Sequence, residues 1–445
     1  MPLPDIRPPT PTGLQVRPFR ALTYRQRDPE HLARVSSPAY DLVTPEGRQR
    51  LAAADPYNIV RLILPRTDRD VPVAGADTPS TGDGSPAERS AAQAAATLRR
   101  WTDEGVLVRD DVPALWLYEL APPDGGPATV GWLGAVSLPA AGSAAVLPHE
   151  DTYAPAVEGR RALLEATQTD LEPIVLAHDP DPELPELVER ARTGSPTIEL
   201  VDDDGVRHRL WRLTDPDLLA DVPGALARTR AVIADGHHRF AAAQAHLRSA
   251  PDDTGADAVL ALVTSSGPGG LRVEAIHRVL PDLPLDAALA AARQGFAEVV
   301  DVPADGPAGP VGAARSWLRS APPGSFLLGA GARLVGLLRP TGELAAAVPH
   351  EAPPAWRQLD VVLAHHGLID RLWQLPDEPE SVVITHDMAT ALRDAGERGG
   401  TALLLRPPVT GDVAAVARAG ARMPRKSTLF VPKPRTGLVL RPLGD

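Results

Sequence analysis

Short apolar runs separated by turn residues predict β-strands along much of the chain. The runs at 114–120 and 129–138 flank a Pro-Asp-Gly-Gly turn, so they predict an antiparallel hairpin. A second hairpin is predicted at 197–213, with Asp204 and Gly205 at its turn. The same reasoning predicts further strands at 14–19, 59–64, 173–178, 258–265, 271–280, 325–339, 381–387 and 401–408.

Apolar positions at helical spacing predict helices between these strands. The segment 87–104 places Ala91, Ala95, Leu98 and Trp101 on one face. Thr44 and Pro45 have the residue types of a helix start, and further helices are predicted at 162–167, 285–296 and 358–370. The fold class that follows is α/β, in the mixed α+β sense, with mixed sheets that contain antiparallel hairpins.

A length of 445 residues predicts two or three lobes. We expect a loose Pro-rich segment at 1–13, followed by an N-terminal α/β lobe at 14–145 that contains a polar loop at 66–87. A central lobe is expected at 146–284. The remaining residues, 285–445, are expected to form a C-terminal α/β lobe that ends in a basic Lys-Ser-Thr motif.

Composition excludes several classes of function. The formal net charge of −12 makes nucleic acid an unlikely partner. Because the chain has no cysteine, it has no disulfide, no cysteine nucleophile and no cysteine-based metal site. No apolar run is long enough to span a membrane, and the N-terminus does not resemble a signal peptide. We therefore expect a cytoplasmic protein without a membrane partner.

The segment 230–249 predicts a buried strand, a tight turn and a helix, with Asp235, Gly236, His237, His238 and Arg239 at the junction. A helix N-terminus attracts anions, so a phosphate is the ligand that this arrangement suits best. Asp235 is a candidate magnesium ligand or a helix cap. The alternative is purely structural, with Arg239 paired to Asp235 and both histidines on the surface. Which of the two histidines faces the site stays open.

A second polar cluster contains His149, Glu150 and Thr152, followed by Arg160 and Arg161. Glu150 is a candidate general base, the arginines are candidate anion ligands, and His149 and Thr152 are candidates for the substrate cleft. The alternative is a solvated turn that leads into a helix. The spacing is not that of a His-Glu-x-x-His zinc motif.

The chain has only two lysines, Lys426 and Lys433, in a sequence that otherwise uses arginine. Lys426 stands beside Ser427 and Thr428, and an ammonium with two hydroxyls suits phosphate binding. The alternative is a solvated basic tail, and for Lys433 an extended surface strand is equally consistent with its proline neighbours. We predict that Lys426→Arg weakens anion binding without unfolding the protein.

Further candidates for the substrate cleft are Tyr57, Asn58 and Arg61, which follow a Pro-Ala-Tyr-Asp segment at 38–41, and His277 within a predicted strand. A structural role in a turn is the alternative for Tyr57 and Asn58. The adjacent pair His365 and His366 lies in an apolar helical segment and is interpreted as a packing pair.

The order of six motifs resembles the domain-of-unknown-function family 1015 over nearly the full length. They are PAYD with DPYNIVRLIL, LPHEDT with its two arginines, IVLAHD, VIADGHHRF, IHRVL and ARMPRKSTLFVPK. The segment 233–239 is also similar to the Asp-Gly-His-x-Arg motif of the ParB/sulfiredoxin superfamily, which includes kinases of free serine. The resemblance implies a ParB/sulfiredoxin-like core in which Asp235, His238 and Arg239 contact nucleotide phosphates or their Mg²⁺. It makes Glu150, Asp235 and His238 the candidate catalytic residues. The chain departs from the family at 156–159, where Ala-Val-Glu-Gly replaces the usual Pro-Lys and Asp.

Three functions fit these observations. The first is a kinase that uses ATP or another nucleotide with Mg²⁺ to phosphorylate a small hydroxyl metabolite such as free serine. The second is a ParB-like nucleotide-binding switch without small-molecule phosphorylation, which would close a homodimer. The third is a metal-dependent hydrolase that uses the histidines. The phosphate acceptor, the nucleotide and the oligomeric state stay open.

Overall fold

The computed structural model describes residues 12–66, 85–140, 142–267, 269–376, 378, 380–424 and 426–444. Most of the expected loose segment at 1–13 and most of the expected loop at 66–87 lie outside these residues. The chain divides into two compact units. Unit 1 comprises Met1–Leu271 and Pro432–Asp445, and unit 2 comprises Arg272–Val431. The chain thus enters unit 2 once and returns to unit 1 for its last residues.

Unit 1 is built on a nine-stranded sheet with the order β6-β11-β8-β12-β5-β4-β10-β9, and β1 pairs with β5. Its strands are β1 (Val16–Arg17), β4 (Leu115–Ala121), β5 (Thr129–Ser137), β6 (Val146–Leu147), β8 (Ile174–His178), β9 (Ile198–Val201), β10 (Arg207–Leu213), β11 (Ala231–Asp235) and β12 (Ala258–Ser265). The pairs β6·β11 and β8·β12 are parallel and the others are antiparallel. The sheet is therefore mixed, and both predicted hairpins are confirmed as β4·β5 and β9·β10.

Two further strand pairs complete the β structure of unit 1. They join β2 (Leu22–Tyr24) to β3 (Leu107–Arg109) and β7 (Thr169–Asp170) to β21 (Arg441–Pro442). The expected lobe boundary between 145 and 146 lies inside unit 1, whose large sheet takes strands from both sides of it.

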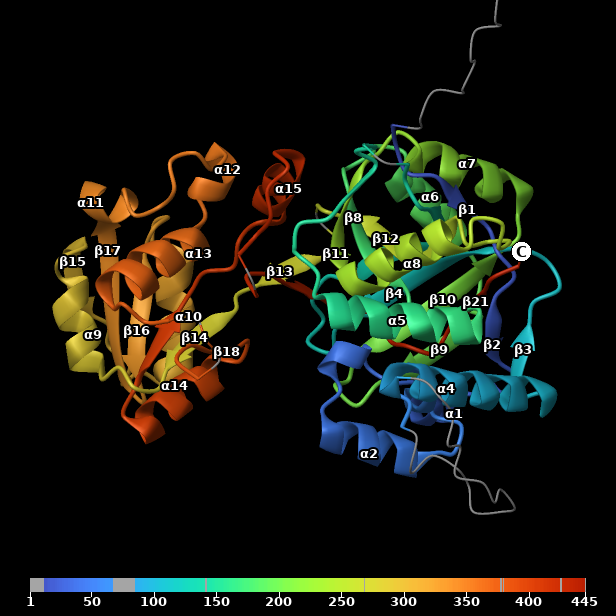
Figure 1. The fold of residues 1–445 in the computed structure, drawn as a ribbon, viewed down its shortest axis with the longest axis horizontal. Helices are drawn as coiled ribbons and strands as arrows, with labels where there is room; N and C mark the ends of the chain where they lie inside the picture. Colours follow the sequence, from blue (N-terminus) through green and yellow to red (C-terminus); the bar gives the residue numbers. More distant parts are fainter. Residues whose placement is uncertain are drawn as a thin grey trace, which may run out of the picture. The chain divides into compact units, whose positions relative to one another are not determined.

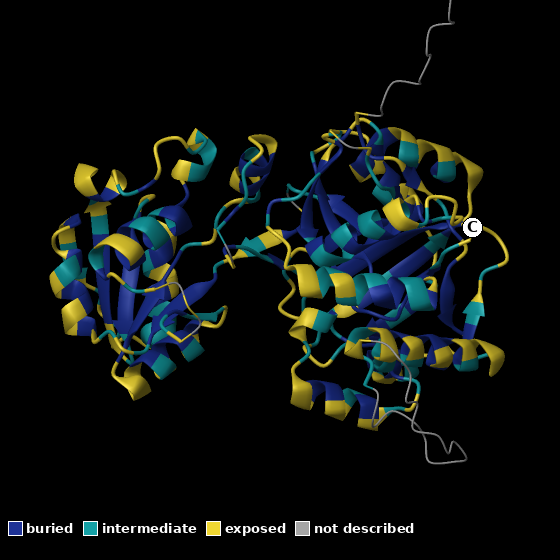
Figure 2. Ribbon diagram, viewed as in Figure 1, coloured by how far each residue is buried: buried dark blue, intermediate teal, exposed yellow. Residues whose placement is uncertain are grey.

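Helices cover both faces of the large sheet (Figure 1). They are α1 (Pro29–Val35), the short 3-10 helix η1 (Tyr40–Leu42), α2 (Pro45–Ala54), α3 (Val60–Ile63), α4 (Pro86–Asp103), α5 (Ala154–Thr167), α6 (Leu184–Ala191), α7 (Pro216–Leu226) and α8 (His237–Ser249). Side chains alternate between the faces along β4, as the strand period of two requires. Trp116 and Tyr118 join the core that contains α4, whereas Leu115 and Leu117 join the core that contains α6, α7 and α8. Figure 2 shows the resulting pattern of buried strands beneath partly exposed helices.

The prediction of a strand at 59–64 is wrong, because Val60–Ile63 form the helix α3. This run is short and mostly buried, with Arg61 and Leu64 partly exposed, so its hydrophobic period could not distinguish a strand from a helix. The polar residue before it decides the outcome, since Asn58 Oδ1 accepts a hydrogen bond from the backbone N–H of Val60 at 2.9 Å. The predicted helix at 87–104 is confirmed as α4, with all four predicted apolar positions buried.

Unit 2 is a six-stranded antiparallel sheet with the order β15-β17-β16-β19-β14-β18. Its strands are β14 (His277–Leu280), β15 (Phe296–Asp301), β16 (Phe326–Ala330), β17 (Arg333–Pro340), β18 (Val383–Thr385) and β19 (Thr401–Leu404), and β13 (Arg272–Glu274) pairs separately with β20 (Leu429–Val431). The helices are α9 (Leu285–Ala292), α10 (Gly309–Ser320), α11 (Gly342–Ala345), α12 (Pro354–Arg357), α13 (Asp360–Leu363), α14 (Met388–Arg398) and α15 (Thr410–Arg418). A π-helix, η2 (Ala364–Leu372), continues directly from α13.

The fold class is therefore mixed α/β, as the sequence predicts. Across the described residues, no helix combines the length and the apolar character that crossing a bilayer requires.

Candidate phosphate-binding site

The predicted strand, turn and helix at 230–249 are present as β11, Gly236 and α8. Gly236 has φ +93°, and a Cβ at this position would lie 2.8 Å from Cγ2 of Ile174. Only glycine fits such a backbone beside a strand. The turn places Asp235 next to the first turn of α8, where the helix dipole is positive.

Asp235 is held by two cations. Its Oδ2 lies 2.6 Å from a guanidinium nitrogen of Arg239, and its Oδ1 lies 2.6 Å from Nζ of Lys433. Lys433 also forms an ion pair with Asp41, which lies in η1. Both oxygens of Asp235 are therefore engaged by cations.

Charge rather than solvent sets the protonation of this cluster. Burial by itself raises the pKa of Asp235, but the positive charges of Arg239 and Lys433 outweigh burial and lower it. Burial likewise lowers the pKa of Lys433, and the carboxylates of Asp235 and Asp41 raise it above its ordinary value. Asp235 and Lys433 are therefore both ionised at neutral pH.

A stack of cations on one aromatic ring extends the cluster. The guanidinium carbon of Arg160 lies 4.1 Å from the ring centroid of Tyr40, and that of Arg239 lies 5.5 Å from it. The backbone N–H of Tyr40 donates to Glu172 at 3.0 Å, and Thr436 donates to the same carboxylate oxygen at 2.9 Å. The residues around Tyr40 and the last segment of the chain thus meet at this site.

A small cavity of about 40 Å³ lies beside these groups, with Arg160, Glu172 and Arg239 among its lining residues. Within the described part of the chain, the buried Nε of Arg239 has no hydrogen-bond partner. The volume suits one or a few water molecules and is far below the several hundred Å³ typical of a small-molecule site. The cavity can therefore solvate Arg239 but cannot itself hold a nucleotide.

The second predicted cluster lies directly against the first. The backbone N–H of His149 donates to Nε2 of His237 at 3.3 Å, and that of Tyr153 donates to Nε2 of His238 at 3.1 Å. The rings of His149 and His237 meet edge to face, with centroids 4.6 Å apart. Glu150 and Thr152 lie between these two contacts, so the structure brings the candidate base to the first turn of α8.

The two histidines differ in burial and in partner. His237 is buried and His238 is partly exposed. Each uses Nε2 to accept a backbone N–H, which leaves that nitrogen without a lone pair for a metal. A metal ion at these histidines would therefore have to bind through Nδ1.

Arg160 and Arg161 point to different surroundings. Arg160 donates to the carbonyl of Ile63 at 2.9 Å and joins the stack on Tyr40. Arg161 pairs with Glu158 and Glu165 on its own helix α5, and its hydrogen bond with Glu158 is the main reason that its pKa is raised. An anion would reach Arg161 only after these ion pairs open.

Asn58 and Arg61 contact the backbone of neighbouring helices. Asn58 is fully buried and donates to the carbonyls of Arg34 and Ser36 at 2.6 and 3.1 Å. Arg61 donates to the carbonyl of Ala52 at 2.6 Å.

Tyr57 has both a ring contact and a backbone contact. Its ring meets Trp101 edge to face, and its carbonyl accepts a hydrogen bond from Tyr24 at 2.6 Å. The contacts of Tyr57, Asn58 and Arg61 tie α1, α2, α3 and α4 together, and a role in a substrate cleft stays a prediction.

The remaining candidates belong to unit 2. Lys426 is exposed with φ +53°, and its carbonyl accepts a hydrogen bond from Arg278 at 3.1 Å. Ser427 donates to the carbonyl of Pro424 at 2.5 Å, and Thr428 immediately precedes β20. Nδ1 of His277 accepts the backbone N–H of Leu405 at 3.3 Å, and burial lowers its pKa to about 4.

Of the two lysines, Lys433 belongs to this cluster, whereas Lys426 belongs to unit 2. Lys433, which resembled a surface strand, has an 8% exposed side chain and binds Asp235 directly. The scarcity of lysine was the signal that pointed to it. No sequence signal singled out Glu172, because a lone carboxylate before a strand is common.

Comparison with curated proteins gives no match. Among solved structures, a free serine kinase in complex with AMP aligns over 64% of this chain and 83% of its own, with 12% identity and a TM-score of 0.29. SbnI with a C-terminal truncation, from Staphylococcus aureus, aligns over 69% and 85%, with 12% identity and a TM-score of 0.33. A conserved hypothetical protein from Pyrococcus furiosus aligns over 64% and 87%, with 13% identity and a TM-score of 0.28. Similarity at this level supports no inference about chemistry.

The family comparison is of a different kind. One family model matches residues 16–362, which is most of the chain, and it runs through the Asp-Gly-His-His-Arg turn and the segment that packs against it. Its description is that of a protein of unknown function. The chain belongs to this family, DUF1015.

Proposed function

We propose that unit 1 binds the phosphate groups of a nucleotide at the first turn of α8, and that it transfers a phosphoryl group from ATP to the hydroxyl of a small metabolite such as free serine. The observation that carries this proposal is the pair of hydrogen bonds from the segment 149–153 to His237 and His238. They support a position for Glu150, which lies between these residues in the chain, near the first turn of α8, where Arg239 and Lys433 bind Asp235.

Phosphate binding is supported by the gathering of cations. The chain as a whole is acidic, yet Arg160, Arg239 and Lys433 lie together here, balanced by the carboxylates of Asp41, Asp235 and Glu172. A phosphate adds charge-assisted hydrogen bonds to such cations and gains from the dipole of α8. Lys433 and Arg239 would then be shared between Asp235 and the phosphate oxygens.

The residues also fit a magnesium ion in their donor chemistry. Asp41 and Asp235 both bind the ammonium of Lys433, and carboxylate oxygens are the ligands that Mg²⁺ prefers. These two carboxylates would hold the ion once Lys433 turned towards a phosphate. Mg²⁺ would supply charge neutralisation on the transferring phosphoryl group.

Glu150 is the proposed general base. It would accept the proton of the substrate hydroxyl while the hydroxyl oxygen bonds to the γ-phosphorus and the nucleoside diphosphate leaves. Phosphoryl transfer depends mainly on positioning and positive charge, and the neighbouring Arg239 and Lys433 supply that charge.

A nucleotide-binding switch without phosphoryl transfer is the second candidate. It is favoured by the ion-pair network, in which Asp235 pairs with both Arg239 and Lys433. A bound phosphate would break these ion pairs. Asp41 in η1 would then lose its contact with Lys433, and the position of η1 could change. Binding alone would then be the function.

The test is incubation of the full-length protein with ATP, Mg²⁺ and a panel of hydroxy amino acids, with ADP formation as the readout. We expect substrate-dependent turnover that Glu150→Gln reduces at least 100-fold and that Arg161→Gln changes less than twofold. Nucleotide binding without turnover on any hydroxyl compound would contradict the kinase and leave the switch. Preferential binding of CTP coupled to DNA would support the ParB-like form.

The Lys426 prediction is tested in the same assay. If Lys426→Arg leaves nucleotide affinity unchanged while Lys433→Met lowers it, phosphate binding belongs to unit 1 alone.

A further inference from the structure

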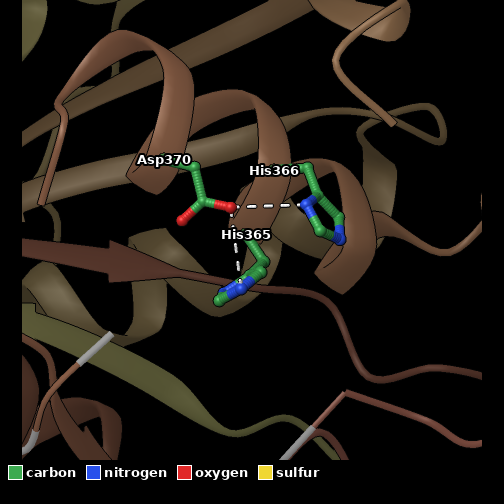
Figure 3. Close-up of side chains that lie close together, drawn as sticks. All are labelled: His365, His366 and Asp370. Carbon is green, nitrogen blue, oxygen red and sulfur yellow. Dashed lines mark ion pairs between the residues drawn. The ribbon is translucent and has the colours of Figure 1, made fainter. Parts of the chain in front are cut away.

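His365, His366 and Asp370 of unit 2 lie on the π-helix η2 and turn towards one another (Figure 3). Oδ2 of Asp370 lies 3.3 Å from Nδ1 of His366 and 3.7 Å from Nε2 of His365. The three side chains are 26–42% exposed, so solvent reaches them. One carboxylate oxygen thus faces two imidazole nitrogens at the surface of this unit.

The π-helix is what brings these three residues together. In an α-helix, with about 100° per residue, adjacent side chains diverge and a residue five positions on lies about 140° away. Hydrogen bonds from i to i+5 widen the turn, and the backbone N–H of Trp373 donates to the carbonyl of Leu368 in this way at 2.9 Å. Asp370 then lies on the same face of the helix as both His365 and His366.

The sequence interpretation of His365 and His366 as a packing pair is therefore incomplete. Their rings meet edge to face at 5.0 Å, and the ring of Trp356 lies 5.6 Å from that of His366. These contacts fix the rings, yet they leave the nitrogens directed at Asp370. Packing alone gives no reason for both nitrogens to converge on one oxygen.

We propose that His365, His366 and Asp370 bind a divalent transition-metal ion of the zinc class. One ligand atom from each residue lies within 4.8 Å of the others. Metal–ligand bonds of about 2.0–2.2 Å place neighbouring ligand atoms roughly 3.3 Å apart in a tetrahedral site. The observed separations of 3.3 and 3.7 Å are close to this spacing, and the longer one exceeds a hydrogen bond.

The donor set selects the class of ion. Imidazole suits zinc, cobalt, nickel, copper and iron, whereas magnesium and calcium favour oxygen ligands. Two nitrogens and one oxygen leave at least one coordination position for water or a substrate, as in catalytic zinc sites. The ion would also join the two ends of η2 and stabilise a helix type that is rare at this length.

The competing explanation is an ion-pair cluster without a metal. It predicts no saturable binding, and it does not involve unit 1. The metal proposal is independent of the proposed kinase function, because its residues all lie in unit 2 and none is assigned to phosphate binding.

The test is titration of the metal-stripped, full-length protein with cobalt(II) alone, followed by visible absorption and by calorimetry. We expect one saturable site with the intense absorption of a tetrahedral or five-coordinate ion. His366→Ala and Asp370→Asn should each weaken binding at least tenfold. His350→Ala is the matched control, because His350 is an exposed unit 2 histidine beside a carboxylate, and it should leave affinity unchanged.

Two results would overturn the proposal. One is the absence of saturable cobalt binding in the wild type. The other is binding that survives in both His366→Ala and Asp370→Asn but is lost in His237→Gln, which would place the ion in unit 1. If His366→Ala does not fold, His366→Gln preserves the shape of the side chain and gives the same comparison, and zinc should raise the melting temperature of the wild type but not of that variant.

Discussion

Lys433 binds Asp235 with 2.6 Å between Nζ and Oδ1, and the two side chains are only 8% and 15% exposed. The pair joins the last segment of the chain to the turn before α8. The two lysines of the chain therefore differ in burial, because Lys433 is buried in this pair and Lys426 is exposed.

We predict that Lys433→Met lowers the free energy of unfolding of unit 1 by about 2 kcal/mol. Removing one partner of a buried pair leaves a buried carboxylate, and the remaining contact of Asp235 with Arg239 limits the loss. Urea denaturation measures the change. Lys426→Met is the matched control and should stay within about 0.5 kcal/mol of the wild type. Equal losses in the two variants would show that the Lys433 pair contributes nothing.

Asp235→Asn should strengthen binding of magnesium-free pyrophosphate, by about tenfold. The substitution removes the negative charge that neutralises Arg239 and Lys433, and a gain of about 1.4 kcal/mol corresponds to that factor. Calorimetry with and without Mg²⁺ separates two roles of the residue. Loss of the Mg²⁺-dependent part of binding would assign Asp235 as a metal ligand, and weaker binding in both conditions would contradict the charge argument.

The sequence identified the Asp-Gly-His-His-Arg turn because its evidence is local. A glycine between a buried strand and an alanine-rich helix specifies the turn wherever it lies in the fold. Lys433 and Asp41 reach Asp235 only through tertiary contacts, and no spacing rule relates positions so distant in the chain. The strand prediction at 59–64 failed for a related reason, since a short and mostly apolar run has no informative period.

The cluster on η2 was missed because its helix type was not foreseen. The two histidines were interpreted as a packing pair because their segment is apolar, and under α-helical geometry His365 and Asp370 would lie on different faces. The preference for hydrogen bonds from i to i+5 arises from the surroundings of the helix, which the periodicity of one segment does not encode.

Unit 2 should lose stability in acid through His277. Burial, and then the charge of Arg278, lowers the pKa of His277 to about 4, whereas an unfolded histidine titrates near 6.5. Between these values the unfolded chain binds a proton that the folded chain excludes. This difference contributes roughly 3 kcal/mol to the free energy of unfolding of unit 2. The contribution is fully present above about pH 6.5 and is lost as the pH falls through about 4.

Hydrogen exchange of peptides that cover β14 and β19 checks this prediction at pH 7 and pH 4.5. His277→Gln keeps an acceptor for the N–H of Leu405 but cannot titrate, so its protection should depend less on pH than that of the wild type. Identical pH profiles for the two proteins would refute the assignment to His277.

Arg441→Met should destabilise unit 1 by about 3–5 kcal/mol. Arg441 and Asp170 form an ion pair with side chains 3% and 8% exposed, and Asp170 also accepts the backbone N–H of Leu260 at 2.8 Å. Breaking such a pair leaves a buried charge. Guanidinium denaturation measures the loss. Arg17→Met supplies the control, because Arg17 and Asp257 are about half exposed and an exposed pair contributes at most about 1 kcal/mol.

The return of the chain to unit 1 after Val431 has a consequence for synthesis on the ribosome. Lys433, Thr436 and Arg441 are translated only after all of unit 2, so unit 1 waits with Asp235, Glu172 and Asp170 lacking these partners. The contacts of these three carboxylates with Lys433, Thr436 and Arg441 then form only after unit 2 has been made, rather than when α8 is made. A nascent or C-terminally clipped chain would carry the Asp-Gly-His-His-Arg turn without its lysine, which confines the completed site to chains whose synthesis has run through both units.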